Sequence, residues 1–234
     1  MEYIYYPSCS FNRLDMQSAK KLREYATSHN MNIAPCCKFD QREASEDKKA
    51  IYFCQECRRT QESKGFSSLS YWEVLDNDKE MLLPDYSGMY VTLLDCWRDR
   101  DHLEIHQAVR SLLDKMHVQY EELDMHGDKA DFCGTLHYET AQYRNELDSF
   151  DHLSHLSKEW QVKLMQEKVT SCPTELIVCC CCRCYNGLLI GGGHPVHLMT
   201  LLMNGYIGRE QELEAHALDL LSKPDPRYNM KMPS

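Results

Sequence analysis

Residues 50–57 read Ala-Ile-Tyr-Phe-Cys-Gln-Glu-Cys, and residues 176–184 read Leu-Ile-Val-Cys-Cys-Cys-Cys-Arg-Cys. In both stretches a short apolar run leads directly into a Cys-x-x-Cys motif. Short apolar runs are typical of buried parallel strands, and functional residues gather at the carboxyl ends of such strands. The two stretches therefore predict two parallel strands, each ending at a cysteine site.

The chain has thirteen cysteines, and nine of them form two matching series. The first series is Cys9, Cys36, Cys37, Cys54 and Cys57, and the second is Cys96, Cys133, Cys181 and Cys184. The segments that begin twelve residues after each Cys-x-x-Cys, 69–75 and 196–202, also correspond. This shared phase indicates a duplicated unit, in which each copy gathers thiolates at one place.

Strand and helix patterns alternate in both halves of the sequence. Helical periodicity covers 14–25 and 103–116, and short extended pieces follow at 31–34 and 117–120. Further helices are predicted over 70–75 and 197–203. The predicted fold class is therefore α/β, with two similar repeated domains whose short parallel sheets are flanked by helices and carry the sites at strand ends.

The predicted domains are residues 1–83 and residues 84–222. A charged linker broken by proline and glycine spans 76–88, and a mostly helical, His-rich insertion spans 139–168. Residues 223–234 are expected to be a poorly ordered tail.

Composition narrows the class of protein. The chain has 234 residues, 43% of them hydrophobic, and a formal net charge of −10, which disfavours nucleic acid as a partner. No secretory signal and no apolar run near ~20 residues is present, so we expect a cytoplasmic protein without membrane insertion. In that compartment, clustered cysteines bind metal or do redox chemistry more often than they form disulfides.

Two metal chemistries fit a Cys-x-x-Cys motif, because one tight turn points two sulfurs at the same centre: tetrahedral zinc and iron–sulfur clusters. Five cysteines in the first series exceed the four of a simple zinc site. The adjacent pair Cys36-Cys37 suits a cluster in which two sulfurs reach different irons, because consecutive side chains of an extended segment point to opposite sides. Zinc stays open as the alternative.

These motifs resemble a known family. Tyr5-Tyr-Pro-Ser-Cys-Ser10, Pro35-Cys-Cys37, Phe53-Cys-Gln-Glu-Cys57, Phe132-Cys-Gly134 and Cys181-Cys-Arg-Cys184 are similar to the duplicated cysteine-rich CCG domain, over roughly residues 1–205. The N-terminal motif resembles that of the HdrB-type subunit of heterodisulfide reductase, and the length resembles that of lactate-utilisation iron–sulfur subunits. The resemblance implies a non-cubane [4Fe-4S] cluster in each half, used to cleave a disulfide.

Carried over residue by residue, the resemblance makes the first series both the cluster ligands and the catalytic group: Cys9, Cys36, Cys37, Cys54 and Cys57. It makes Cys96, Cys133, Cys181 and Cys184 the ligands of the second half. Phe132 stands where the family has the first of two adjacent cysteines, so a four-cysteine cubane is the simpler expectation there. Lys38 replaces the glycine after the first pair. The extra cysteines Cys172, Cys179, Cys180 and Cys182 are open as substitute ligands.

The implied activity is that of an oxidoreductase subunit of a larger complex, for disulfide or thiol reduction or for electron transfer. The chain lacks a bacterial ferredoxin motif and a dinucleotide fingerprint. A ferredoxin-like or flavin-containing partner subunit and a small thiol or disulfide substrate are therefore implied. The alternative function is a non-catalytic scaffold that binds zinc or a cubane cluster for protein interaction.

Other polar residues near the motifs have open roles. Arg58, Arg59, Arg98 and Arg100 follow motif cysteines and either offset thiolate charge, bind a substrate carboxylate or are merely solvated. His137 and His194 are candidates to donate a proton to a leaving thiolate. The stretch Gly191-Gly-Gly-His-Pro195 lacks the lysine of a phosphate-binding loop, so we expect a flexible connection.

Overall fold

The computed structural model describes residues 1–134, 136–137 and 157–223. The first unit consists of β1 (Glu2–Tyr5), α1 (Cys9–Leu14), α2 (Met16–Ser28), β2 (Asn32–Ile33), β3 (Lys48–Tyr52), α3 (Gln55–Glu62), β4 (Ser67–Ser70) and α4 (Tyr71–Asn77). The second unit consists of β5 (Tyr90–Leu94), η1 (Trp97–Asp99), α5 (Leu103–Lys115), β6 (Gln119–Glu122), η2 (Gly127–Lys129), β7 (Phe132–Cys133), β8 (Leu136–His137), α7 (Lys158–Thr170), β9 (Leu176–Cys179), α8 (Cys182–Ile190), β10 (His194–His197), α9 (Leu198–Leu202) and α10 (Glu210–Ser222).

Each unit contains a four-stranded parallel sheet, and the two sheets have the same topology. The strand orders are β2-β1-β3-β4 and β6-β5-β9-β10. The carboxyl-terminal residues of the central strands are buried, as expected for parallel strands covered on both faces. The predicted α/β class, with two parallel sheets flanked by helices, is confirmed.

The turns that end corresponding helices also match between the units. Asn30 and His117 both have φ of 56°, directly after α2 and α5. Gly65 and Gly192 have φ of 86° and 81° and lie three and two residues after the last residues of α3 and α8. A left-handed residue lets the chain reverse and satisfy the last helical carbonyl groups. The same solution at the same places agrees with a duplicated unit.

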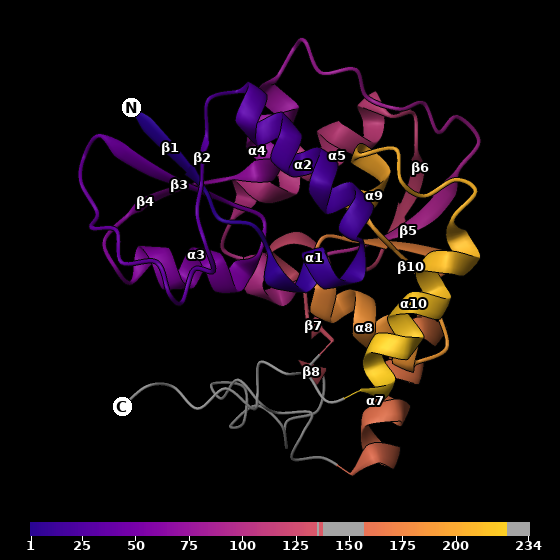
Figure 1. Cartoon of the computed structure of the whole chain (residues 1–234). Coiled ribbons are helices and arrows are strands. Elements are labelled where there is room, and N and C mark those ends of the chain that lie inside the picture. The colour runs from indigo at the N-terminus through magenta and orange to yellow at the C-terminus, as the bar shows by residue number, and fades with distance from the viewer. Residues whose placement is uncertain (135, 138–156, 224–234) are drawn as a thin grey trace.

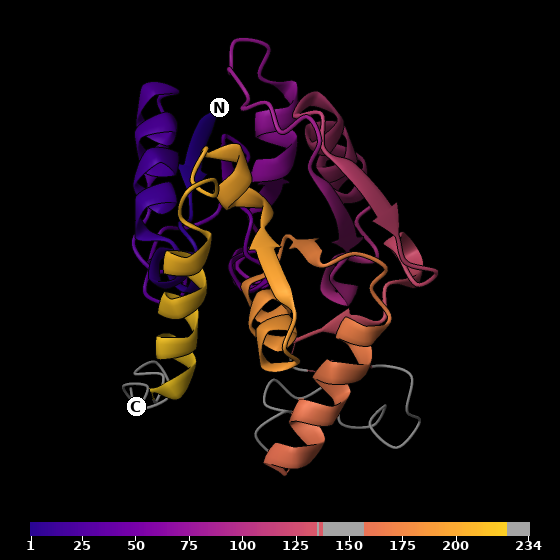
Figure 2. The ribbon, with the colours of Figure 1, turned by 90° about the vertical axis from the view of Figure 1, so that its right-hand side faces the viewer.

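The two units meet with the carboxyl ends of their sheets toward the middle of the molecule (Figure 1). In that view α2, α4, α5 and α9 lie along the upper side, and α1, α3 and α8 lie along the lower side. Helix α4 of the first unit packs against α5 of the second, and α10 packs against α1. Figure 2 shows α7 at the bottom of the second unit. The buried apolar side chains of both units form one continuous core.

Two details differ from the pattern read in the sequence. The predicted helix 14–25 is divided at Asp15, whose carboxylate caps α2 by accepting a bond from the Ser18 amide at 3.2 Å. The glycine-rich stretch after α8 is a packed turn rather than a flexible connection. A Cβ on Gly191 would lie 2.4 Å from the Met165 carbonyl oxygen of α7.

Residues 139–156 of the predicted insertion and the tail after residue 223 lie outside the described residues, whereas α7 covers 158–170. No helix within the described ranges is long and apolar enough to cross a membrane.

Candidate metal centre

Four cysteines of the second unit converge on one point. Cys96 follows β5, Cys133 belongs to β7, and Cys181 and Cys184 lie at the N-cap and in the first turn of α8. Their sulfurs lie within 4.8 Å of one another, and each residue is at most 3% exposed. Segments far apart in the sequence thus build one buried, all-sulfur group, here called the second cysteine group.

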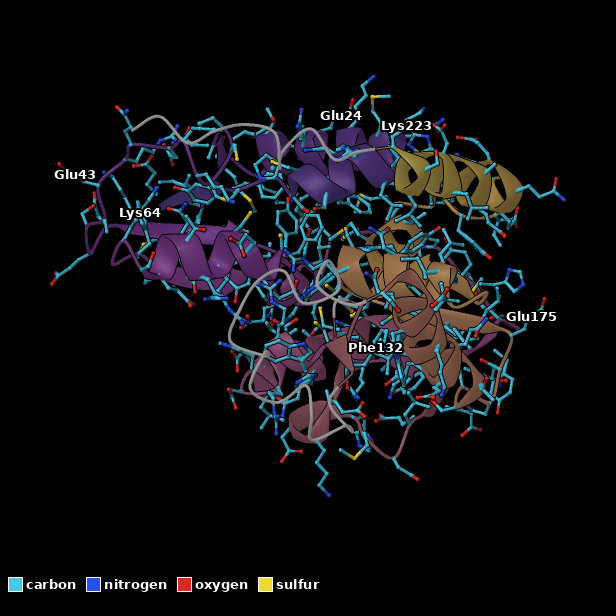
Figure 3. All side chains as sticks on the ribbon, turned by 90° about the horizontal axis from the view of Figure 1, so that it is seen from below. Glu24, Glu43, Lys64, Phe132, Glu175 and Lys223 are labelled. Carbon is cyan, nitrogen blue, oxygen red and sulfur yellow. The ribbon has the colours of Figure 1, made fainter. Side chains whose placement is uncertain are left out.

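Gly134 explains how Cys133 reaches this group. A Cβ at Gly134 would lie 1.6 Å from the Arg183 carbonyl oxygen and 2.9 Å from the Gly187 amide nitrogen. The backbone of β7 therefore touches the backbone of α8, a contact that only glycine allows. Phe132, labelled in Figure 3, lies beside α8 in this region. The glycine of the Phe132-Cys-Gly134 motif is thus a packing requirement of the site.

The protonation pattern of the second cysteine group suits a metal ligand set. Hydrogen bonds from the thiols of Cys181, Cys184 and Cys96 hold the pKa of Cys133 well below its ordinary value. Burial raises the pKa values of Cys96 and Cys184 well above theirs. One thiolate is thus stabilised by three thiols, and a bound cation takes over this role when the thiols ionise.

The spacing of the four sulfurs distinguishes between a single metal ion and a four-iron cluster. A single tetrahedral ion with metal–sulfur bonds of ~2.3 Å places its sulfurs about 3.8 Å apart, which agrees with a group confined within 4.8 Å. In a four-iron cluster each cysteine binds a different iron, so the sulfurs must stand further apart. The four thiols, as they stand, are spaced for a single metal ion, and a four-iron cluster needs a wider spacing of the sulfurs.

The five cysteines of the first unit also gather, in a more open arrangement called the first cysteine group. Cys9 begins α1, Cys54 caps α3 and Cys57 lies in its first turn. The Cys9 thiol contacts that of Cys36, and the Cys57 thiol contacts those of Cys37 and Cys54. Cys9, Cys36 and Cys54 are half-buried, whereas Cys37 and Cys57 are buried. Within the described ranges, the second group alone has three or more potential ligand atoms mutually within 4.8 Å.

Two thiols of the first cysteine group ionise easily. A hydrogen bond from the Cys57 thiol lowers the pKa of Cys54 to about 6 and is the main reason that the pKa of Cys37 falls to about 7. Burial and the neighbouring Cys36 raise the pKa of Cys9 to about 11. Because the Cys57 thiol has a single proton to donate, it stabilises one thiolate, at Cys54 or at Cys37, near neutral pH.

The Cys36-Cys37 pair lies in a turn that is held by hydrogen bonds from residues in and just after α3. The Cys37 carbonyl oxygen accepts hydrogen bonds from Gln61 Nε2 and Lys64 Nζ, both at 3.2 Å. Lys64, labelled in Figure 3 at the end of α3, also donates to the Asp40 carbonyl oxygen at 2.7 Å. In a turn, unlike a strand, two consecutive side chains can face the same site. Both sulfurs of the pair therefore belong to the group.

Phe132 behaves differently from Cys36, the residue at the corresponding position. It lies in the extended strand β7, where neighbouring side chains alternate, so its ring is on the side opposite Cys133. The Lys168 ammonium lies 5.7 Å from the centre of the Phe132 ring and pairs with Asp131 at 2.8 Å. Phe132 is thus part of the packing of α7.

Some of the arginines and histidines singled out in the sequence lie near the cysteine groups, and others lie away from them. Arg58 and Arg98 are buried between the two cysteine groups, whereas Arg100 donates to the Asp128 carbonyl oxygen at the surface. His194 begins β10, at the end of the sheet away from the cysteines, and pairs with Glu214 at 3.5 Å. For His137 only the backbone is described.

The extra cysteines lie outside the compact group of four. Cys179 and Cys180 are buried at the end of β9, and the Cys172 thiol donates to the Lys168 carbonyl oxygen at 3.4 Å. Sequence reasoning missed the carboxylates between the sites, Glu56 and Asp99, since an acidic residue beside a cysteine motif looks like ordinary surface charge.

Comparison of the chain with family models, with curated proteins and with solved structures finds no match.

Proposed function

We propose that this chain is an iron–sulfur redox protein similar to the HdrB-type subunit of heterodisulfide reductase, acting in disulfide or thiol reduction or in electron transfer. The observation that carries the proposal is the pair of cysteine groups at equivalent strand ends of a duplicated α/β unit. One group is closed and buried, and the other is open and half-exposed. That difference favours separate roles for the two groups.

The first cysteine group is the proposed reactive site. Its half-buried residues Cys9, Cys36 and Cys54 leave access for a small disulfide, and the Cys57 thiol stabilises a thiolate at Cys54 or Cys37 near neutral pH. A [4Fe-4S] cluster bound there, non-cubane by resemblance, supplies single electrons. Reduction of one disulfide to two thiols consumes two electrons and two protons, and a ferredoxin-like or flavin-containing partner is the proposed source of the electrons.

The second cysteine group is the proposed buried centre. Cys96, Cys133, Cys181 and Cys184 supply four thiolates away from solvent, so substrate has no direct approach. A centre of this kind holds or relays an electron, or stabilises the fold.

Metal analysis tests the proposal. The protein is purified and reconstituted without oxygen, and iron, acid-labile sulfide and zinc are measured together with the visible spectrum. We expect iron and sulfide in near-equal amounts, on the order of four to eight irons per chain. Cys37→Ser and Cys133→Ser should each remove one spectroscopic species, while Cys172→Ser, outside both groups, should remove none. Zinc without sulfide would refute the iron–sulfur assignment.

A structural zinc site at the second cysteine group is the second candidate, because its sulfurs are already as close as a single tetrahedral ion requires. It predicts about one zinc per chain, lost in Cys133→Ser and kept in Cys37→Ser. The protein would then be a metal-stabilised scaffold, at least in its second unit.

A further inference from the structure

An ion pair joins the two cysteine groups. Glu56 lies between Cys54 and Cys57 in the first Cys-x-x-Cys motif, and Arg98 follows Cys96 by two residues. Arg98 Nη2 lies 3.2 Å from Glu56 Oε2, with the two side chains 7% and 30% exposed. A residue of the first Cys-x-x-Cys motif thus pairs with a residue two positions after Cys96, a cysteine of the second group.

A second link fixes this geometry. Arg58 Nη1 donates to Asp99 Oδ1 at 2.8 Å, and Arg58 Nη2 donates to the Arg98 carbonyl oxygen at 2.6 Å. Gln55 donates to the other Asp99 oxygen. The Arg58 and Asp99 side chains are 6% and 5% exposed. The start of α3 is therefore held against η1 by buried polar contacts, which leave the Glu56–Arg98 pair little freedom to separate.

Arg98 also faces the second cysteine group. Arg98 belongs to η1, which begins directly after Cys96 and packs against β7, the strand that carries Cys133. Glu56 in turn lies in the first turn of α3, between Cys54 and Cys57 of the first cysteine group. The charges are thus arranged in series: thiolates of the first group, the Glu56 carboxylate, the Arg98 guanidinium, and thiolates of the second group.

We propose that the Glu56–Arg98 pair couples the two cysteine groups electrostatically. Arg98 is the counter-charge that stabilises a four-thiolate metal centre at the second group, and Glu56 offsets part of that charge from within the first motif. A charge that appears at the first group therefore changes the stability of the centre at the second, and by linkage the reverse also holds. Both residues are positioning residues, since neither offers a sulfur to a metal.

The coupling can be measured with Co²⁺, which needs neither iron nor sulfide. The chain carries Cys9→Ser and Cys36→Ser, so that the four-thiolate Co²⁺ absorption band reports on the second cysteine group. Affinity is obtained by competition with a chelator. Arg98→Gln should weaken Co²⁺ binding, and Glu56→Gln should strengthen it, each by roughly threefold to tenfold for one unit charge in a partly screened site. Lys20→Gln, which removes one charge from an exposed surface pair of α2, is the matched control and should leave the Co²⁺ affinity unchanged.

The direction in which Glu56→Gln changes the Co²⁺ affinity distinguishes electrostatic coupling from a purely structural role of Glu56. If Glu56 only holds α3 against η1, its loss loosens the site, so Glu56→Gln weakens Co²⁺ binding and lowers the melting temperature. Weaker or unchanged binding in that variant overturns the coupling, even if iron is found at both groups. Absence of a four-thiolate band before any change to the pair would remove the second group as a metal site, and the coupling with it. Tighter binding supports the coupling whether or not the native metal is iron.

Discussion

At the scale of single residues, Gly134 is the position where the second site tolerates least change. Its backbone contacts that of α8, and a Cβ would lie 1.6 Å from the Arg183 carbonyl oxygen. Gly134→Ala should move Cys133 out of the group and cost about 2–3 kcal/mol of stability, since neither backbone can yield easily.

The test compares metal content and urea midpoints with those of Lys38→Ala. Lys38 stands at the corresponding position of the first unit and is exposed, so its replacement should change little. Full metal content in Gly134→Ala would show that the contact is not required for the site.

His197 is a buried histidine that makes stability depend on pH. It is 1% exposed, packs on Phe11 with ring centres 4.7 Å apart, and accepts a hydrogen bond from the Met199 amide. Burial lowers its pKa from 6.5 to about 3. Between these values the unfolded chain binds a proton that the folded chain does not, so this contribution to stability is complete above pH 6.5 and is lost as the pH falls toward 3.

Lowering the pH from 7 to 4.5 should therefore cost about 2.5 kcal/mol through His197 alone. His197→Asn keeps a capping acceptor but cannot titrate, so its stability should fall less over this range. Urea denaturation at both pH values measures the difference. His194→Asn replaces a half-exposed histidine and should retain the original pH dependence; equal slopes in all three chains would contradict the assignment to His197.

At the scale of elements, the extended geometry of β7 is the reason that the two cysteine groups differ. The first unit presents its adjacent cysteines from a turn, whereas the second presents Cys133 from a strand that places residue 132 on the opposite side. The resemblance to the CCG domain alone predicts that Phe132→Cys gives the metal centre of the second group a spectrum like that of the first. The strand geometry predicts otherwise.

Phe132→Cys should leave the spectrum of the metal-loaded second group unchanged and lower stability by about 3 kcal/mol, because a fully buried ring over Lys168 is lost. Absorption spectra and urea midpoints of the reconstituted chains give the answer. Phe132→Leu is the control for lost packing without a new thiol. A new spectroscopic species in Phe132→Cys, absent from Phe132→Leu, would show that residue 132 reaches the centre.

Helical periodicity and short apolar runs were sufficient to predict several helices and strands. The periodicity over 103–116 corresponds to α5, and the apolar runs before each Cys-x-x-Cys correspond to β3 and β9. The break at Asp15 was missed, because the residues on both sides continue a helical pattern and the cap is a single side-chain contact.

The parts of the site that escaped prediction depend on contacts between distant residues. The requirement for glycine at position 134 comes from a helix fifty residues later. The Glu56–Arg98 pair joins residues 42 positions apart that share no motif. The nine matched cysteines could be chosen from spacing, but their division into a closed and an open group depends on whether the chain at each point is a strand or a turn.

At the scale of the whole molecule, buried polar contacts join the two units. Asp15 of the first unit is 1% exposed and accepts hydrogen bonds from Thr200 Oγ1 at 3.0 Å and Arg209 Nη1 at 3.3 Å. Lys21 Nζ donates to the Met203 carbonyl oxygen at 2.7 Å. The domain boundary between residues 83 and 84 stays a prediction, and these contacts indicate how the two units should behave when the protein unfolds.

We expect the units to unfold in one cooperative step. Loss of the second unit removes the hydrogen bonds that Thr200 and Arg209 donate to Asp15, and it exposes apolar side chains of the shared core to water. Trp72 reports on the first unit and Trp97 on the second. Two chains that each keep one of these tryptophans, with Trp160 replaced by Phe in both, should give coincident urea transitions. Asp15→Ala should lower both midpoints together, whereas a shift confined to the Trp72 signal would mean that the units are independent domains.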